Sequence, residues 1–392
     1  MNNQVKINES DKAAAKSDKS PGKKQTRKGS KSRFFRNRNN TPAFGAIDLG
    51  TNNCRLLVAH PTASGFKVVD AFSRIVRLGE GLSSSGELSE QAIERTLEAL
   101  RICVEKMERR QVRFSRNVAT QACREAGNCA EFMERVEREV RIKLDIIDPQ
   151  EEARLAVMGC KALLDERYSN AIVFDIGGGS TELIWLRIGE NKNPEIIGWT
   201  SVPYGVVNLS EKYGTKHALT DDQYLEMKNM VKAELEAFEE QHGMRAHVER
   251  GEVQLLGTSG TITTLTSMHL DLERYDRDQV DGTWVTSAHM QGLCMELSRM
   301  SYEQRAARGG IGLDRAELVV AGCAILEAIM DLWPIEHIRV ADRGIREGVL
   351  LDLMEQNRPK QRSRNNRSGK KKFFRRRRKK KTPGNPATGE NT

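Results

Sequence analysis

The sequence predicts an α/β protein built from two related domains with a cleft between them. Its 392 residues exceed the roughly 100–200 that a single domain usually contains. From Ala43 onward, short apolar runs alternate with stretches of helical periodicity. Two of the runs share one pattern of apolar residues, Asp, an apolar residue and Gly: AIDLGTNN at 46–53 and VFDIGGGS at 173–180. This repetition indicates a duplicated unit with two facing turns, although a single Asp-x-Gly also arises by chance.

The first domain is expected to span residues 41–162. Its predicted strands cover 44–49, 54–59, 66–72, 117–120 and 143–148. Apolar residues recur at helical spacing in two places, Ile93, Leu97, Leu100 and Val104, and then Phe132, Val136 and Val140.

The second domain is expected to span residues 163–357 and to end in a helix. Its predicted strands cover 170–178, 182–188, 195–202, 252–259 and 337–344. Thr220 and Gln223 have the spacing of a capping box, so a helix should begin at Thr220. Further helices are expected over 286–300, 314–331 and 344–355.

Charge is divided unevenly along the chain. The overall net charge is +9, but residues 1–40 carry +9 and residues 358–392 carry +14, so the part between carries −14. Both ends are rich in Lys, Arg, Ser and Asn and poor in apolar residues, which predicts disordered basic tails around an acidic folded body.

Three glycine-rich segments follow predicted strands and predict a phosphate-binding cleft. Glycine lets backbone N–H groups approach an anion closely, and neighbouring hydroxyl groups add donors. None has the P-loop spacing, and each alone would be an ordinary turn after a strand. The candidate phosphate-binding residues are Gly50, Thr51 and Asn52, then Gly177, Gly178, Gly179 and Ser180, and finally Thr258, Ser259 and Gly260.

Carboxylates beside these turns would repel a phosphate unless a divalent cation lay between them. Asp48, Asp175 and Glu182 therefore predict a Mg²⁺ site. The alternative is that the two aspartates hydrogen-bond their own turns and that Glu182 is an exposed strand residue.

Glu151 and Glu152 open a predicted helix near the crossing between the domains. Acids in a first helical turn usually complement the helix dipole, but a carboxylate at the edge of a phosphate cleft could instead take a proton from water. Basic residues should line such a cleft to neutralise charge. Arg124 is the first candidate, followed by Arg74 and Arg77, and the alternative for each is a surface ion pair.

These motifs together resemble the exopolyphosphatase and guanosine-pentaphosphate phosphatase (Ppx/GppA) family, a branch of the actin, sugar-kinase and Hsp70 superfamily. The resemblance runs from about Ala43 to Leu353. Its motifs, in order, are AIDLGTNNCRLLVA, ATQACREA, EEARLAVMG, VFDIGGGSTEL, LLGTSGTITTL and ADRGIREGVL.

The resemblance implies two actin-like domains and hydrolysis of the terminal phosphate of inorganic polyphosphate or of the 5′-γ-phosphate of guanosine pentaphosphate. By motif position, Glu152 would be the catalytic base, and Asp175 and Glu182 would belong to the metal and catalytic set. The glycine turns, Asn52 and Arg124 would hold phosphate, and Asp48 would join the metal or phosphate cluster. Asn53 stands where family members often have Ser, which puts a hydroxyl contact of the first turn in doubt. The HD-like domain of longer relatives is expected to be absent, because the basic tail begins soon after Glu355.

Two other functions stay open at this point. The same cleft could bind ATP for a kinase or an ATPase, and the Phe pairs and cations of KSRFFRNRNN (31–40) and KKKFFRRRRKKK (370–381) could bind RNA or retain a polyanion. No apolar stretch approaches the about 20 residues of a membrane span, and no secretory signal is evident. The seven scattered cysteines fit reduced, buried thiols and a cytoplasmic protein. A homodimer is the default expectation for the oligomeric state.

Overall fold

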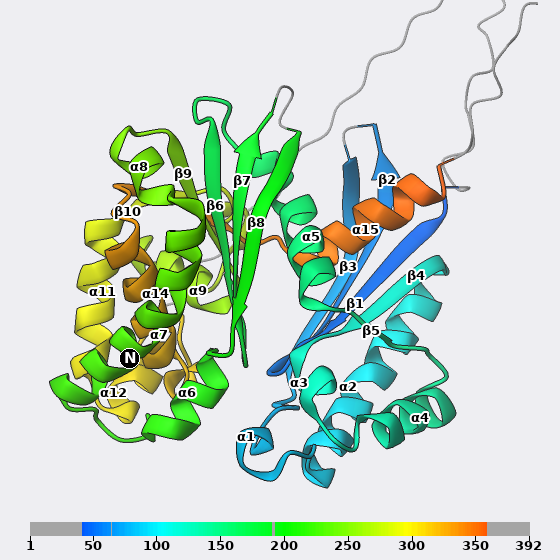
Figure 1. Ribbon diagram of the computed structural model, residues 1–392. Helices are drawn as coiled ribbons and strands as arrows, with labels where there is room; N and C mark the ends of the chain where they lie inside the picture. Colours follow the sequence, from blue (N-terminus) through cyan, green and yellow to red (C-terminus); the bar gives the residue numbers. More distant parts are fainter. Residues whose placement is uncertain (1–40, 64, 190–192, 359–392) are drawn as a thin grey trace, which may run out of the picture. The chain divides into compact units, whose positions relative to one another are not determined.

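A computed structural model describes residues 41–63, 65–189 and 193–358. The two basic tails predicted at 1–40 and 358–392 lie outside the described residues, apart from Arg358. The body contains two mixed sheets with helices packed against them, so the α/β class is confirmed (Figure 1).

The first sheet has the strand order β3-β2-β1-β4-β5. Strand β1 pairs antiparallel with β2 and parallel with β4, and β2 continues antiparallel to β3. The strands are β1 (Ala43–Leu49), β2 (Asn53–Thr62), β3 (Gly65–Ile75), β4 (Val112–Ala119) and β5 (Asp145–Ile146). The helices that follow in this part are α1 (Leu82–Ser85), α2 (Glu90–Arg109), α3 (Gln121–Glu125), α4 (Cys129–Val140) and α5 (Pro149–Cys160), with a 3₁₀ turn at Lys161–Leu163.

The second sheet has the order β10-β11-β9-β6-β7-β8. Its strands are β6 (Asn170–Ile176), β7 (Thr181–Ile188), β8 (Pro194–Val202), β9 (Val253–Thr258), β10 (Trp284–Thr286) and β11 (His337–Ala341). The helices are α6 (Val206–Tyr213), α7 (Asp221–His242), α8 (Met244–Glu249), α9 (Gly260–His269), α10 (Arg277–Val280), α11 (Ser287–Arg299), α12 (Tyr302–Ala307), α13 (Leu313–Ala316), α14 (Val319–Leu332) and α15 (Ile345–Gln356).

The duplication predicted from the two Asp-x-Gly turns is visible in the sheet topology. In each sheet an antiparallel three-strand meander leads to parallel strands, β3-β2-β1 then β4 and β5, and β8-β7-β6 then β9 and β11. Strands β1 and β6 occupy the same place in the two orders. Their C-terminal ends, which carry the turns, therefore hold equivalent positions.

Several predicted elements have other bounds in the structure, and two of them change most. The strand expected over 143–148 shrinks to β5, because Asp148 caps the N-terminus of α5 with its side chain and Pro149 is already helical. The helix expected over 314–331 is divided into α13 and α14. The helix predicted from Thr220 is confirmed as α7, whose N-terminus has the capping box.

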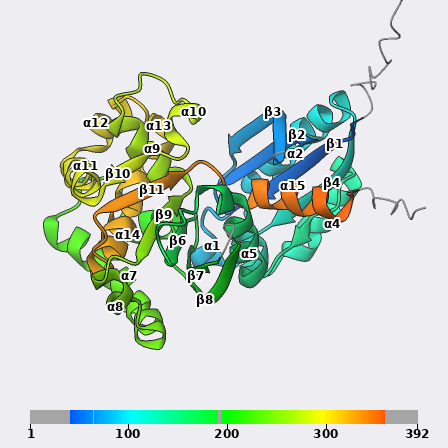
Figure 2. The same ribbon diagram turned by 90° about the horizontal axis from the view of Figure 1, so that it is seen from above.

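Helix α15 packs differently from the predicted grouping. The predicted second domain includes this helix, but Ile345, Val349 and Leu350 share a buried cluster with Phe44 of β1 and Leu57 of β2. The two views show α15 beside α5 (Figures 1 and 2). The predicted domain boundaries themselves stay predictions.

Two glycines let α5 and α15 approach closely. A Cβ atom at Gly348 would lie 2.0 Å from the backbone oxygen of Leu155, and one at Gly159 would lie 2.1 Å from that of Gly344. Side chains of any size would push these helices apart.

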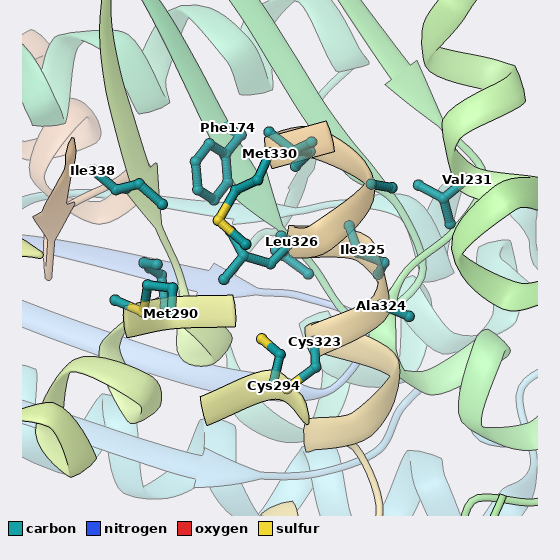
Figure 3. Packing of buried hydrophobic residues seen from close by; sticks show 14 of the residues in the cluster. Phe174, Val231, Met290, Cys294, Cys323, Ala324, Ile325, Leu326, Met330 and Ile338 are labelled. Carbon is teal, nitrogen blue, oxygen red and sulfur yellow. The ribbon is translucent and has the colours of Figure 1, made fainter. Parts of the chain in front are cut away.

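The cores explain why the sheets hold the turns firmly. One face of the first sheet packs under α2 and α4, and its other face packs under α5 and α15. In the second part, α14 runs through a large cluster that includes Phe174, Met290 and Leu326 (Figure 3). All seven cysteines are free and buried, as predicted. Among the described residues, no helix has the length and apolarity needed to cross a bilayer.

Candidate active site

The first glycine turn connects β1 to β2 and is held by the loop after β3. The N–H of Gly50 donates to the carbonyl of Asn53 at 2.9 Å, which closes the turn. The N–H groups of Val76 and Arg77 both donate to the carbonyl of Asn52. Thr51 and Asn52 are buried, yet the side-chain Oδ1 of Asn52 has no hydrogen-bond partner. A buried acceptor without a protein partner can accept from a water or from a ligand donor.

The second turn connects β6 to β7 and contacts the first. Gly178 is the point of contact, because a Cβ atom there would lie 3.0 Å from the Cβ of Thr51 and 3.1 Å from the backbone nitrogen of Asn52. The N–H groups of Val206 and Val207 donate to the carbonyls of Gly177 and Gly178 and fix the turn from behind. The two turns therefore lie together, as the sequence predicted.

The third segment joins the same place through Ser259. Its hydroxyl donates to the carbonyl of Ile176 at 2.8 Å, at the end of β6. Ser259 has a φ of 84°, which is strained for a residue with a side chain, and Gly260 begins α9 immediately after it. The hydroxyl of Thr258 donates instead to the carbonyl of Arg343 and so supports the turn from outside.

A cleft of about 540 Å³ lies along these segments. Its polar lining comes from Asn52, Gly177, Gly178, Ser259 and Gly260, together with Arg55 and Arg315, and its apolar lining includes Ile75, Ile176 and Leu318. Of the predicted phosphate-binding residues, the following do not line this cleft: Gly50, Thr51, Arg124, Gly179, Ser180 and Thr258. Thr51 and Gly179 line a second, smaller cavity.

Two predicted carboxylates are paired on adjacent strands of the second sheet. Asp175 of β6 is directly opposite Glu182 of β7, where like charges destabilise each other. Burial, reinforced by the charge of Glu182, raises the pKa of Asp175 to about 7. Burial also raises the pKa of Glu182, although the hydroxyls of Ser180 and Ser201 donate to its Oε1 at 2.5 and 3.0 Å and oppose the rise.

The equivalent position in the first sheet carries opposite charges. Asp48 of β1 is directly opposite Arg55 of β2. Burial raises the pKa of Asp48, and Arg55 partly offsets it. The charge of Arg55 also acts on Asp175, which places the first aspartate and the second carboxylate pair in one electrostatic neighbourhood.

Glu152 belongs to this neighbourhood, whereas Glu151 does not. Glu152 is only 7% exposed, and its Oε2 accepts a hydrogen bond from Nη1 of Arg124 at 2.7 Å. Burial, together with the charges of Glu182 and Asp175, raises the pKa of Glu152 well above its ordinary value, and Arg124 opposes the rise. Glu151 is partly exposed and pairs with two other arginines.

The arginine candidates are separated by the structure. Arg124 lies at the site, and its Nη1 also donates to the carbonyl of Ile147. Arg74 forms an ion pair with Glu98 at the surface, which is the alternative given for it. Arg77 pairs with the largely buried Glu317, and its backbone N–H holds the first turn. Arg55 is a site residue that was not predicted from the sequence. The duplicated pattern could have indicated it. Arg55 is paired with Asp48 in the first sheet, at the position that Glu182 occupies opposite Asp175 in the second sheet.

A metal ion could be held by the facing carboxylates of Asp175 and Glu182, with Asp48 nearby. In the part of the chain that the structure describes, no three His, Cys, Asp or Glu side chains are grouped to hold a metal ion. A pair is sufficient for Mg²⁺, which commonly takes one or two carboxylates and completes its shell with waters and phosphate oxygens. The destabilised like-charge pair fits such a cation.

Comparison with known proteins finds relatives that match over most of the body. A guanosine-5′-triphosphate,3′-diphosphate pyrophosphatase of Aeromonas salmonicida is 30% identical over 324 residues, which cover 81% of this chain and 60% of that protein. The chain thus spans less than two thirds of the length of such relatives. The crystal structure of an exopolyphosphatase of Cytophaga hutchinsonii matches with a TM-score of 0.72 and 26% identity, over 80% of this chain and 98% of that one.

A crystal structure of a Ppx/GppA family member of Aquifex aeolicus matches over 81% of this chain and 99% of that one, with a TM-score of 0.66 and 27% identity. These matches confirm the two actin-like parts of the predicted fold. The family model matches residues 57–357, nearly the whole described body. The chain therefore belongs to the Ppx/GppA phosphatase family.

Proposed function

We propose that this chain is a phosphoanhydride hydrolase that removes the terminal phosphate of inorganic polyphosphate, the 5′-γ-phosphate of guanosine pentaphosphate, or both. One observation carries the proposal. A buried glutamate with a raised pKa, Glu152, lies in one electrostatic cluster with Asp175 and Glu182, and Glu182 lies beside Gly177, which lines the open cleft. The names of the relatives, a pyrophosphatase of guanosine phosphates and an exopolyphosphatase, support both substrates.

In this proposal the cleft binds and orients the anionic end of the substrate. Backbone N–H groups of Gly178 and of the Ser259–Gly260 segment supply donors, and Arg55 and Arg315 supply positive charge along the lining. The buried oxygen of Asn52 requires a donor, which a water or a protonated phosphate oxygen can provide. Positioning and charge neutralisation account for most of the catalysis of phosphoryl transfer.

Glu152 then acts as the general base. Its carboxylate takes a proton from the water that attacks the terminal phosphorus, and the bond to the bridging oxygen breaks as the new P–O bond forms. Arg124 holds Oε2 of Glu152 and keeps enough of the carboxylate ionised for this step. A base with a raised pKa accepts protons more strongly than an ordinary carboxylate does.

We also propose Mg²⁺ dependence, with Asp175 and Glu182 as ligands and Asp48 as an additional or water-mediated one. When bound, the ion would neutralise phosphate charge and stabilise the charge that develops during transfer. The like-charge pair across β6 and β7 is the structural reason to expect it.

The decisive experiment replaces Glu152 and uses Glu151 as the matched control. Both glutamates lie in the first turn of α5, but only Glu152 is buried among the other carboxylates. Glu152→Gln is expected to lower kcat/KM by about 10²–10⁴ on both substrates, the usual contribution of a general base, while Glu151→Gln stays close to wild type. Equal activities of the two variants would show that the assigned base is wrong.

The same assay separates the remaining alternatives. Phosphate release from polyphosphate and from guanosine pentaphosphate is compared with transfer from ATP to candidate acceptors, and activity confined to ATP would show a kinase or ATPase. The contact between the basic tails and RNA or long polyanions, the cytoplasmic location and the homodimer stay predictions.

A further inference from the structure

An ion pair joins the two parts of the body beside the cleft. Nη1 of Arg77, in the loop after β3, lies 3.5 Å from Oε2 of Glu317, which lies between α13 and α14. The two side chains are 29% and 14% exposed, so water screens their charges only partly. Arg77 follows the cleft residue Ile75 by two positions, and Glu317 directly precedes the cleft residue Leu318. The pair therefore connects chain segments that line the cleft from the two parts.

Arg77 is also tied to the first glycine turn. Its N–H donates to the carbonyl of Asn52 at 3.0 Å, and the N–H of Gly79 donates to the carbonyl of Thr51 at 2.9 Å. Arg77 has a φ of 48°, a left-handed conformation that is strained for a residue with a side chain and persists only where its surroundings fix it. The loop thus fixes the backbone of Arg77 relative to the turn, and a force on its guanidinium acts on Thr51 and Asn52.

Glu317 is held in a similar way within the second part. Its backbone carbonyl accepts hydrogen bonds from the hydroxyls of Ser210 at 3.3 Å and Thr215 at 2.6 Å. Its Oε1 lies 3.6 Å from Nζ of Lys216, which leaves Oε2 to Arg77. The carboxylate therefore has a defined position opposite the loop after β3.

The other carboxylate near Arg77 is less suited to hold it. Oε1 of Glu80 lies 3.8 Å from Nη1 of Arg77, but the Glu80 side chain is 45% exposed. Its Oε2 is already bound by Nη2 of Arg95 at 2.7 Å. Glu317 is nearer and more buried, so it is the stronger partner.

The first two glycine turns need such a support. They touch at Gly178, but among the hydrogen bonds of the described residues none joins one turn to the other. The N–H of Gly81 donates to Oε1 of Glu211 at 3.0 Å and brings α1 to α6 (Figure 1). Glu211 is exposed, so water and salt weaken that contact. The ion pair of Arg77 is the better shielded of these two polar contacts.

We propose that Arg77 and Glu317 are a positioning pair that sets the separation of the two sides of the cleft. The inference rests on the proposed function. Asn52 and Arg55 line the cleft from the first part and Arg315 from the second, so one anionic substrate reaches all three only when the sides are close. Neither Arg77 nor Glu317 lines the cleft, and the pair acts through those groups.

Loss of the pair should weaken substrate binding more than the chemical step. A chain whose sides separate spends less time in the state that binds, and its apparent affinity falls by that fraction. Each bound complex keeps the same arrangement of reacting groups. KM should therefore rise while kcat stays nearly constant.

The test is a double-mutant cycle on whichever substrate the wild-type chain cleaves, polyphosphate or guanosine pentaphosphate. Arg77→Gln and Glu317→Gln should each raise KM about fivefold, the upper end for a partly exposed ion pair, with kcat within about twofold of wild type. The double variant should show about the same fivefold rise because both substitutions remove one contact, whereas independent effects would multiply to about 25-fold. Arg74→Gln, which loses an ion pair to Glu98 inside the first part, is the control and should keep the wild-type KM.

Three kinetic results would overturn the proposal. A fall in the KM of Glu317→Gln would show that this carboxylate only shields Arg77 and Lys216, which would then bind the substrate directly. A rise of about 25-fold in the double variant would show two separate roles. A fall in kcat at unchanged KM would show that the pair does not act on binding.

A distance measurement tests the pair without catalysis. All seven native cysteines are buried, so spin labels can be attached to Gln91→Cys on α2 and Glu234→Cys on α7, which are exposed positions in the two parts. Arg77→Gln and Glu317→Gln should each broaden the distribution of label distances about twofold, and Arg74→Gln should leave it unchanged. Equal widths in all chains would overturn the proposal. If the wild-type chain cleaves neither substrate, the proposed function fails, and this measurement still decides whether the pair fixes the two parts.

Discussion

Replacing Arg124 by glutamine should change the pH dependence of hydrolysis more than its maximum. Nη1 of Arg124 lies 2.7 Å from Oε2 of Glu152, and its charge lowers a pKa that burial and the neighbouring acids raise. A general base works only when it is deprotonated. Without Arg124 the pKa of Glu152 rises further, so Arg124→Gln should lose activity on the acid side and regain it at higher pH.

The size of the loss follows from the geometry of this pair. Arg124 is hydrogen-bonded to Glu152, and the two side chains are only 18% and 9% exposed, so water screens the pair weakly. A hydrogen bond to a charged group is worth about 1.5–3 kcal/mol, and each 1.36 kcal/mol is a factor of ten. On the acid side of the profile, kcat/KM of Arg124→Gln should therefore be about 10–100-fold below that of wild type.

The assay is kcat/KM for phosphate release between about pH 5 and pH 10 at constant ionic strength. Arg116→Gln is the control, because Arg116 makes the corresponding bond, at 2.8 Å, to the neighbouring Glu151. Its acid limb should stay in place. A uniform loss in Arg124→Gln at every pH, with no shift of the limb, would mean that Arg124 only binds substrate and would refute the reasoning about Glu152.

Three further outcomes are expected. Gly348→Ala should lower the free energy of unfolding in urea by about 1–3 kcal/mol, because its Cβ would meet the backbone of α5, whereas Gly292→Ala, in open space on α11, should be neutral or stabilising by up to about 1 kcal/mol. Ser201→Ala removes a hydrogen bond to Glu182, and a bond to a charged group is worth about 1.5–3 kcal/mol. The substitution should lower kcat about tenfold in the wild-type chain. In a chain that already carries Glu182→Gln, it should change kcat little. A chain truncated to residues 41–357 should turn over short substrates almost normally and bind long polyanions more weakly at low salt; equal binding by both chains would contradict a role for the tails.

The fold could be predicted well where the pattern is local. Alternation of apolar residues identified most strands, and the repeated strand with Asp-x-Gly predicted two equivalent sheets. The packing of α15 could not be predicted in the same way. The apolar residues of a helix show that one face is buried, but not which sheet covers it, and here the close glycine contact at Gly348 brings the helix to α5 and β1.

Site residues could be predicted where a sequence motif places them directly at a turn. They were harder to predict where the pairing of two strands brings them to the site. Ser201 and Arg55 come to the site because each is opposite a motif carboxylate, Ser201 opposite Glu182 and Arg55 opposite Asp48. Register needs the pairing of two strands, which a single sequence gives only indirectly.

An acid at the start of a helix can complement the helix dipole or act as a proton acceptor. The two adjacent glutamates of α5 show that one helix start can provide both. One residue along a helix turns the side chain by about 100°, so Glu151 and Glu152 must face different surroundings. Glu151 turns toward Arg116 and Arg154, which lower its pKa through hydrogen bonds, and remains an ordinary ionised acid of the first turn. Glu152 turns toward the other carboxylates and is buried with Arg124 as its hydrogen-bonded cation. The same helix start therefore provides a stabilising charge and a proton acceptor, and exchanging the roles of the two positions would require rotating α5 against both sheets on which it packs.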